Sequence, residues 1–295
     1  MSEFDFIRDL KPLADPVHAL NLEDDAATLP ASDVICTDTL VEGVHFFGNE
    51  DPASLAHKVL AVNVSDLAAM NARATHALLN ISLTMRCDTA WRASFIDGLK
   101  RACDGFGLQI LGGDTTGSGG PIVLSATLLG SLEGRQVWKR ADAQVGDLVC
   151  VSGTVGQGGL GLRDWGAGQH TEFAAHYRKP QPQTGLLGLT GVGGCADVSD
   201  GLIADLAHIC RASNVTAVVD LDQVPLADAD EDRVMQLTGG DDYQLVFTLS
   251  AKATPPQDCT IIGWVKEASR EGPVILRGPD AIVAATKAKG GYSHF

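Results

Sequence analysis

Strand-like and helix-like segments alternate along the first half of this 295-residue chain, and this alternation limits its possible folds most strongly. The run DVICTDTL at residues 33–40 has the β-branched and apolar residues of a buried strand. Pro52 is suited to a first helical turn, and the Ala- and Leu-rich stretch at residues 53–70 favours a helix. Residues 76–85 alternate like a strand, and residues 89–106 are amphipathic and helical. We therefore expect a mixed α/β fold.

Two further strands, GLQILGGD at residues 107–114 and IVLSATLLGSL at residues 122–132, complete this half. The segment KRADAQVGDLVC at residues 139–150 contains a turn and the start of a new strand, which favours a boundary there. A mass of 30.9 kDa is enough for two domains, each with its own core. The expected domains are residues 1–142 and 143–295.

The second half is again mixed. Residues 196–213 run from a short strand into a helix that begins near Ser199 or Asp200. Three more strand-like runs follow, separated by turn-rich connections. They are VTAVVDL (215–221), YQLVFTL (243–249) and TIIGWV (260–265).

The charge balance limits the partners of the chain. Its 22 basic and 37 acidic residues give a formal net charge of −15, which argues against binding nucleic acid or an anionic membrane through bulk electrostatics. No stretch approaches the roughly 20 apolar residues that span a bilayer. The N-terminus does not resemble a signal peptide, and a short helix is expected at Asp5–Leu13. Seven scattered cysteines without a C-x-x-C pair indicate free thiols. We expect a soluble cytoplasmic protein.

A Gly-rich segment, SGTVGQGGLGL at residues 152–162, could form a phosphate-binding loop. It lacks the lysine of a P-loop and the downstream acid of a dinucleotide fingerprint. A flexible interdomain turn is the preferred interpretation, and a nucleotide contact stays the alternative.

Aspartates are more informative, because 28 of the 37 acids are Asp and several stand at strand ends or beside glycines. Carboxyl ends of strands are the usual ligand sites of open α/β sheets, and oxygen ligands select hard cations. A single such Asp is better explained as a helix cap or turn former. For six such aspartates taken together, a shared metal site and these structural roles are equally good explanations. The six are Asp25, Asp38, Asp66, Asp114, Asp197 and Asp200.

Eight motifs, taken in order along the whole chain, resemble those of the thiamine-monophosphate kinase family. Its parent superfamily is that of the aminoimidazole-ribotide-synthetase-like ATP-binding enzymes. The motifs are DDAA (24–27), TDTLVEGVHF (37–46), HKVLAVNVSDLAAMNA (57–72), LGGDTTG (111–117), KRADAQVGD (139–147), DVSDGLIADLAHI (197–209), GGDDYQLVFT (239–248) and GGYSHF (290–295).

The resemblance implies an N-terminal ATP-binding domain whose sheet forms a homodimer, and a C-terminal α/β domain that closes the active cleft. It implies Mg²⁺-dependent transfer of the γ-phosphoryl group of ATP directly onto thiamine monophosphate, giving thiamine diphosphate and ADP. It implies several Mg²⁺ ions and no phosphoenzyme.

The resemblance also assigns residues. It implies Mg²⁺ ligands at Asp25, Thr37, Asp38, Asp66, Asp114, Asp197 and Asp200. ATP contacts are expected at Gly113, Asp114, Arg140 and Ser199, and acceptor contacts at His45, Asp241 and Tyr292, which stacks on an aromatic ring of the acceptor. Asp66, Asp200 and Arg140 are the expected catalytic residues. From the residues alone, His45 would be structural and Tyr292 a terminal packing residue.

Three positions depart from the family pattern. Glu23 stands where a glycine is usual, Cys36 where a hydroxyl residue is common, and Asp241 where a glutamate is expected. Asp241 is one methylene shorter than Glu, which predicts a longer or water-mediated contact with the acceptor.

Two alternatives remain. One is another ATP-dependent synthetase of the superfamily, but no N-terminal or C-terminal reactive cysteine is present to favour it. The other is a non-catalytic protein that binds nucleotide or thiamine phosphate and has lost turnover through Glu23 and Asp241.

Overall fold

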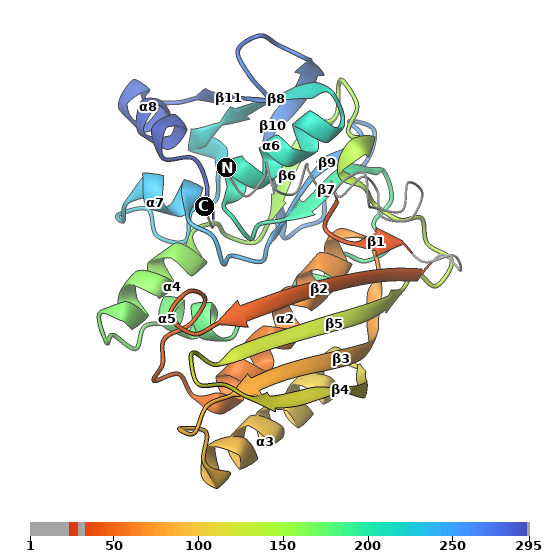
Figure 1. Ribbon diagram of the computed structural model, residues 1–295. Helices are drawn as coiled ribbons and strands as arrows, with labels where there is room; N and C mark the ends of the chain where they lie inside the picture. The colour runs from red at the N-terminus through yellow and green to blue at the C-terminus, as the bar shows by residue number, and fades with distance from the viewer. Residues whose placement is uncertain (1–23, 29–32, 294–295) are drawn as a thin grey trace.

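The computed structural model describes residues 24–28 and 33–293. In these ranges, two β-sheets and seven α-helices form the mixed α/β, two-domain architecture expected from the sequence (Figure 1). The helix expected at Asp5–Leu13, the Glu23 departure and the final His294-Phe295 pair lie outside the described residues. None of the described helices is both long and apolar enough to cross a membrane.

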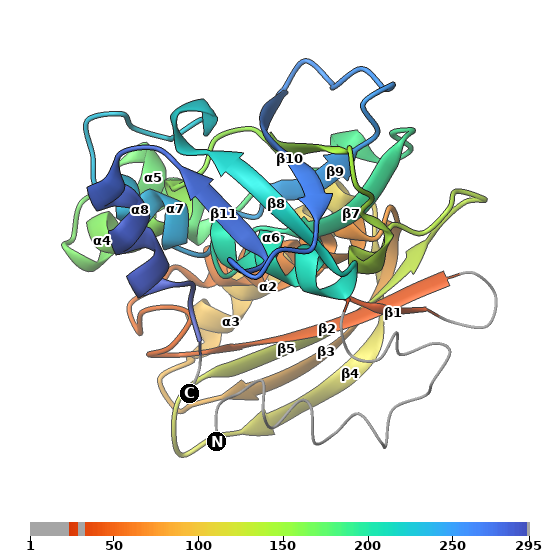
Figure 2. The same cartoon turned by 90° about the horizontal axis from the view of Figure 1, so that it is seen from above.

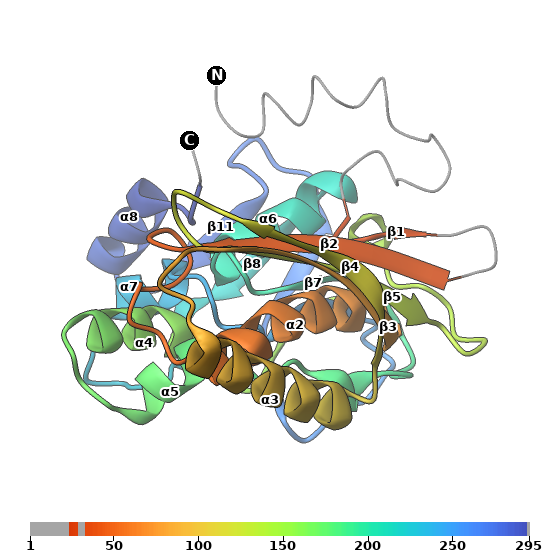
Figure 3. The same ribbon diagram turned by 60° about the horizontal axis from the view of Figure 1, so that its bottom comes forward.

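The first sheet has five strands in the order β1-β2-β5-β3-β4. Strands β2, β5 and β3 pair antiparallel, whereas β3 and β4 are parallel and are therefore joined by a crossover helix, α3 (Thr89–Phe106). Helices α2 and α3 cover one face of this sheet (Figure 3). The strand bounds are β1 (Ala27–Thr28), β2 (Asp33–Val41), β3 (Arg73–Leu83), β4 (Gln109–Gly117) and β5 (Val123–Ser131).

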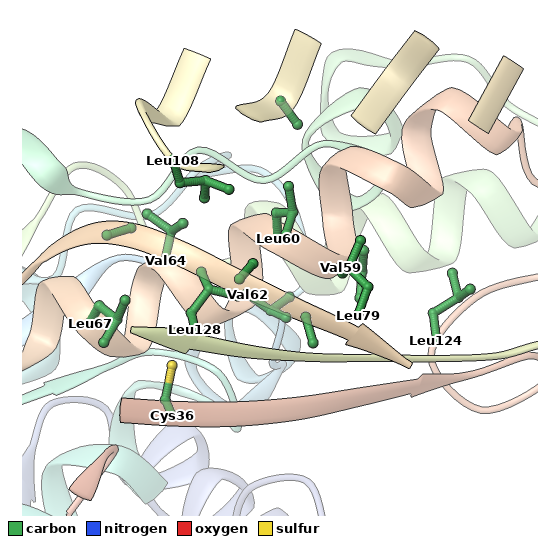
Figure 4. Close-up of a cluster of buried hydrophobic side chains, with 14 of the residues drawn as sticks. Cys36, Val59, Leu60, Val62, Val64, Leu67, Leu79, Leu108, Leu124 and Leu128 are labelled. Atoms are coloured by element: carbon green, nitrogen blue, oxygen red, sulfur yellow. The ribbon is translucent and has the colours of Figure 1, made fainter. Parts of the chain in front are cut away.

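Helix α2 (Pro52–Ala69) is buried along most of its length, because it packs against the first sheet, α3 and strand β7 of the second domain. The Asp51 carboxylate caps its N-terminus by accepting a hydrogen bond from the Ser54 N–H at 3.0 Å. Val59, Leu60 and Val64 of α2 belong to the core of the first domain, together with Leu79, Leu108 and Leu128 (Figure 4). A polar side chain on such a helix therefore needs partners inside the protein.

The second sheet has six strands in the order β11-β8-β10-β6-β9-β7. Helix α6 (Leu202–Ala212) supplies apolar residues to the core on one face, and the end of α2 contributes to the other (Figure 2). The strand bounds are β6 (Leu148–Ser152), β7 (Val192–Asp197), β8 (Val215–Asp220), β9 (Leu245–Leu249), β10 (Cys259–Glu267) and β11 (Val274–Arg277).

The remaining helices lie at the same side of both sheets (Figure 1). They are α4 (Gln157–Gly166), α5 (Glu172–Arg178), α7 (Arg233–Thr238) and α8 (Asp280–Lys289). The described residues also form three 3₁₀ turns: η3 (Arg140–Asp142), η4 (Thr184–Leu186) and η5 (Leu221–Gln223). The boundary expected after residue 142 falls between η3 and β6, and we retain it as a proposal.

Most predicted elements are confirmed, and two differ. Helix α6 begins at Leu202 instead of near Ser199 or Asp200, because Gly201 has a φ of 122°, which is not helical. The Asp200 and Gly201 N–H groups donate to the Asp205 carboxylate at 3.1 and 3.0 Å. The Gly-rich segment is not a flexible turn, since α4 occupies residues 157–166.

Candidate active site

A cleft of about 1090 Å³ is lined by residues of both domains. Its lining includes most of the residues that the sequence predicts for the site. These are Thr37, Asp38, His45, Asp66, Asp197, Ser199, Asp200, Asp241 and Tyr292.

Four carboxylates lie close to one another and are here called the carboxylate cluster: Asp25, Asp38, Asp66 and Asp197. Asp38, Asp66 and Asp197 line the cleft. Oxygens of Asp25, Asp66 and Asp197 all lie within 4.8 Å of one another. Asp38 on β2 interacts with the Asp66 side chain on α2. Four parts of the chain thus bring these acids together: the segment before β1, strand β2, helix α2 and the end of β7.

Burial and mutual repulsion make these carboxyls difficult to ionise. Burial, followed by the charges of neighbouring carboxylates, raises the pKa of Asp66 and of Asp197 well above the ordinary value. Burial also raises the pKa of Asp25 and of Asp38. Two like charges 4 Å apart repel by about 4 kcal/mol at an effective dielectric constant of 20. The ionised cluster therefore needs a counter-charge.

The donor set fits a hard divalent cation. Asp197 Oδ2 accepts a hydrogen bond from Ser65 Oγ at 2.7 Å, whereas its buried Oδ1 has no hydrogen-bond partner among the described residues. Carboxylate oxygens are the preferred ligands of such cations.

Arg140 already supplies one positive charge to the cluster. Its guanidinium forms an ion pair with Asp25, including a contact of 3.3 Å from Nε to Oδ2. Its backbone N–H donates to Asp24 Oδ1 at 2.6 Å, and its carbonyl accepts from Ser213 Oγ at 2.7 Å. Asp25 and Asp197 help to keep the pKa of Arg140 above its ordinary value.

Ser199 and Asp200 lie in the turn between β7 and α6, on the wall of the cleft. The Asp205 carboxylate fixes this turn through the two amide contacts described above. The Asp200 carbonyl accepts a hydrogen bond from the Tyr292 N–H at 3.0 Å, which ties the C-terminal segment to the same turn.

Elsewhere on the wall of the cleft, His45 and Asp241 share a buried lysine. Lys58 Nζ lies 3.3 Å from Asp241 Oδ2 and 3.3 Å from the His45 carbonyl oxygen. Asp241 Oδ1 accepts a hydrogen bond from Tyr243 Oη at 2.7 Å, and Tyr177 Oη donates to the His45 carbonyl at 2.9 Å.

Four residues beside the site carry no role predicted from the sequence: Lys58, Tyr177, Tyr243 and Asp205. For Lys58 a signal existed, because it is a charged residue in a helix whose other residues are mostly apolar. Asp205 belongs to the motif DVSDGLIADLAHI, but only the fold brings its carboxylate back to the turn at Asp200.

The predicted ligands Thr37, Asp114 and Asp200 and the predicted ATP contact Gly113 are not part of the carboxylate cluster. The Thr37 hydroxyl interacts with the Ala126 carbonyl at 3.0 Å and with the Thr127 hydroxyl at 3.0 Å. Gly113 and Asp114 are on β4, which is separated from β2 by β5 and β3. Three steps between neighbouring strands correspond to about 14 Å. The roles expected for these residues therefore stay predictions.

The glycines of the Gly-rich segment serve a contact inside the protein. The Gly156 and Gly158 N–H groups donate to the Asp242 carboxylate at 2.7 and 2.8 Å, at the N-terminus of α4. A Cβ at Gly158 would lie 2.2 Å from the Gly240 carbonyl oxygen. The chain's own Asp242 thus occupies amides that a phosphate-binding loop would offer to a ligand.

Family models define the class of the protein. The model of the AIR synthase related protein N-terminal domain matches residues 23–132, and that of the AIR synthase related protein C-terminal domain matches residues 144–275. The chain is thus an AIR synthase related protein with both domains of that class.

Individual relatives narrow the assignment. The thiamine-monophosphate kinase of Caulobacter vibrioides is 40% identical over 268 residues, covering 83% of this chain and 76% of the relative. That of Escherichia coli strain K12 is 35% identical over 307 residues, covering 94% and 92%. The solved structure of AaThiL complexed with AMPPCP and TMP has a TM-score of 0.88 at 27% identity and covers 100% of this chain and 97% of its own. The chain belongs to the thiamine-monophosphate kinase family.

Proposed function

We propose that this protein transfers the γ-phosphoryl group of ATP to thiamine monophosphate, giving thiamine diphosphate and ADP. The observation that carries the proposal is one cleft in which the carboxylate cluster lies beside Asp241, His45 and Tyr292. The family membership supports it, and so does the relative AaThiL, which was solved with AMPPCP and TMP.

We infer that Asp25, Asp38, Asp66 and Asp197 hold Mg²⁺ ions and that Asp200 holds a further one. The buried Asp197 Oδ1, which has no donor among the described residues, supports a cation at this position. When bound, Mg²⁺ supplies the charge that lets two phosphorylated substrates approach each other. The number of carboxylates in one cleft supports more than one ion.

The chain's own residues position the substrates. An oxygen of the acceptor phosphate attacks the γ-phosphorus of ATP, while the bond between that phosphorus and the oxygen of ADP breaks. The attacking oxygen is already anionic, so no protein base is required. Arg140, once released from Asp25, provides a guanidinium that can bind phosphate oxygens. Ser199 lies on the wall of the cleft and contributes an ATP contact.

The acceptor is recognised at the other side of the cleft. Its thiazolium ring is a cation, so the Asp241 carboxylate is a suitable partner. Tyr292 lines the cleft and is 47% exposed, and we infer that its ring stacks on an aromatic ring of the acceptor. His45 completes this side, with its Nδ1 accepting a hydrogen bond from the Val41 N–H at 3.0 Å.

We also propose that the protein is a homodimer that associates through the first sheet. Strand β4 is exposed along all nine residues, and the large apolar side chains Leu78, Ile110 and Leu111 are 40%, 41% and 57% exposed. Such exposure on a sheet is typical of an association surface. We infer that the dimer brings Gly113 and Asp114 of one subunit to the cleft of the other.

The compartment we propose is the cytoplasm. All seven cysteines are free thiols, as is usual for proteins of a reducing compartment.

Product analysis tests the proposed reaction. Purified protein incubated with ATP, MgCl₂ and thiamine monophosphate should form thiamine diphosphate and ADP in equal amounts. EDTA should abolish both products. Failure to form thiamine diphosphate above the level of the EDTA control would overturn the proposal.

A further inference from the structure

Lys58 is a buried cation directly beneath the acceptor side of the cleft. Its side chain is 2% exposed, although its ammonium forms an ion pair with Asp241, which lines the cleft. The ammonium also lies 3.7 Å from the centroid of the Tyr177 ring. Burial lowers the pKa of Lys58, and the Asp241 charge opposes this shift. Lys58 does not line the cleft, so it acts on a ligand only through its neighbours.

The carboxylate of Asp241 is held from two sides. Lys58 contacts Oδ2, and the Tyr243 hydroxyl donates to Oδ1. Both Asp241 and Tyr243 have backbone φ angles in the left-handed region, 63° and 52°. Residues other than glycine adopt this conformation rarely, and it tends to occur at functional sites. Asp242, the residue between them, accepts hydrogen bonds from the Gly156 and Gly158 N–H groups and so attaches this segment to the N-terminus of α4.

The same ammonium also holds His45. Lys58 and Tyr177 both donate to the carbonyl oxygen of His45, at 3.3 and 2.9 Å. His45 belongs to the first domain, whereas Asp241 belongs to the second. A single side chain on α2 therefore fixes the relative position of two groups that the proposed function assigns to acceptor binding.

We propose that Lys58 is a positioning residue of the acceptor site, which sets the affinity for thiamine monophosphate by holding Asp241 and His45 in one arrangement. The inference rests on the proposed function for the identity of the acceptor. A buried ion pair is by itself weak evidence of stabilisation, because the desolvation of two charges offsets most of their attraction. An effect on the geometry of the site explains better why a charge is buried on this mostly apolar helix.

Two variants test the role. Lys58→Met removes the ammonium and keeps most of the side-chain length, and Tyr243→Phe removes only the other hydrogen bond to Asp241. Each should raise the KM for thiamine monophosphate, Lys58→Met by about tenfold or more, while the KM for ATP stays within about twofold. In an Asp241→Asn background, Lys58→Met should add little to the acceptor KM, since the two residues act as a pair.

Arg178→Met is the matched control. Arg178 forms an ion pair with Glu50 at 2.6 Å, which joins α5 to the segment just before α2, and it does not contact Asp241 or His45. This variant should lower the unfolding temperature and leave the acceptor KM unchanged.

The affinity for thiamine monophosphate, measured by calorimetry, gives a readout that does not require turnover. A wild type that binds thiamine monophosphate without phosphorylating it would contradict the proposed function alone. If Lys58→Met and Tyr243→Phe keep the wild-type affinity and acceptor KM within about twofold, Lys58 has only a structural role and this inference is wrong. If Lys58→Met does not fold, the result for Tyr243→Phe decides.

Discussion

At the scale of single residues, acidic side chains lie close enough for their charges to repel, and several of them have a polar or basic partner. Arg140 pairs with Asp25, Ser65 with Asp197, and Lys58 with Asp241. Asp25 and Asp197 could be predicted as site candidates from the pattern of aspartates, with Asp197 at the end of β7, whereas Asp241 was expected only from the family resemblance. Their partners could not, because each belongs to a segment distant in the sequence, and only the fold brings the two together.

Asp66→Asn tests the carboxylate cluster. The substitution keeps the size of the side chain but removes a charge at the centre of the cluster, so activity should fall on the order of 100-fold or more. The fold should remain intact, because a repulsive buried charge is lost. Turnover and circular dichroism would check this. Asp97→Asn, at an exposed position on α3, is the control with wild-type activity. Near wild-type turnover by the Asp66→Asn variant would show that Asp66 is not a ligand of the metal site.

The raised carboxyl pKa values predict how Mg²⁺ stabilisation depends on pH. Burial raises the pKa of Asp24 to about 6, and burial raises the pKa values of Asp66 and Asp197 well above the ordinary carboxyl value. A raised folded-state pKa means that the folded chain binds more protons than the unfolded chain. Without metal, stability from these groups is therefore lost as pH rises from about 4 through their folded pKa values.

Metal binding requires the ionised carboxylates, so its effect has the opposite pH dependence. The increase in unfolding temperature caused by MgCl₂ should be larger at about pH 8 than at about pH 5.5. Differential scanning fluorimetry with and without MgCl₂ would measure both values. Equal increases at the two pH values would contradict a Mg²⁺ site made of these acids.

At the scale of elements, helix α3 and strand β2 follow from sequence pattern, whereas α4 does not. Glycine is a poor helix former, so the Gly-rich segment predicted a turn. The helix forms because Asp242 accepts hydrogen bonds from its first amides and because Gly158 permits close contact with residues 240–241. Both causes are tertiary contacts, which a local pattern does not contain.

Gly158→Ala tests this packing. The added methyl group would overlap the Gly240 carbonyl, and overpacking of this kind costs about 1–3 kcal/mol. The free energy of unfolding, measured with urea, should fall by that amount, and the acceptor KM should rise because Asp241 is displaced. Gly105→Ala in α3 is the control, since the site has open space, and it should stabilise by up to about 1 kcal/mol. Wild-type stability of Gly158→Ala would contradict the close contact.

At the scale of the whole molecule, the cleft depends on both domains, and the predicted ligand Asp114 is too far away within one chain. The collinear motifs predict which residues function together, but they do not distinguish residues of one subunit from those of two. Asp114 on the far edge strand is the residue for which the distinction matters.

Mixing two inactive variants tests the dimer. Asp66→Asn and Asp114→Asn should each be inactive as homodimers. If Asp114 acts on the cleft of its partner, refolded mixtures contain heterodimers with one intact site, and about a quarter of wild-type activity returns. If both residues act within one chain, or if the protein is a monomer, mixing restores nothing. Gel filtration with light scattering would give the oligomeric state independently.

The most direct test of the whole account follows the transferred group itself. ATP labelled in its γ-phosphate, incubated with the protein, MgCl₂ and thiamine monophosphate, should pass the label into thiamine diphosphate in step with ADP formation. No label should stay on the protein, because transfer is direct. Release of the label as inorganic phosphate without labelled thiamine diphosphate, or its retention on the protein, would contradict the account.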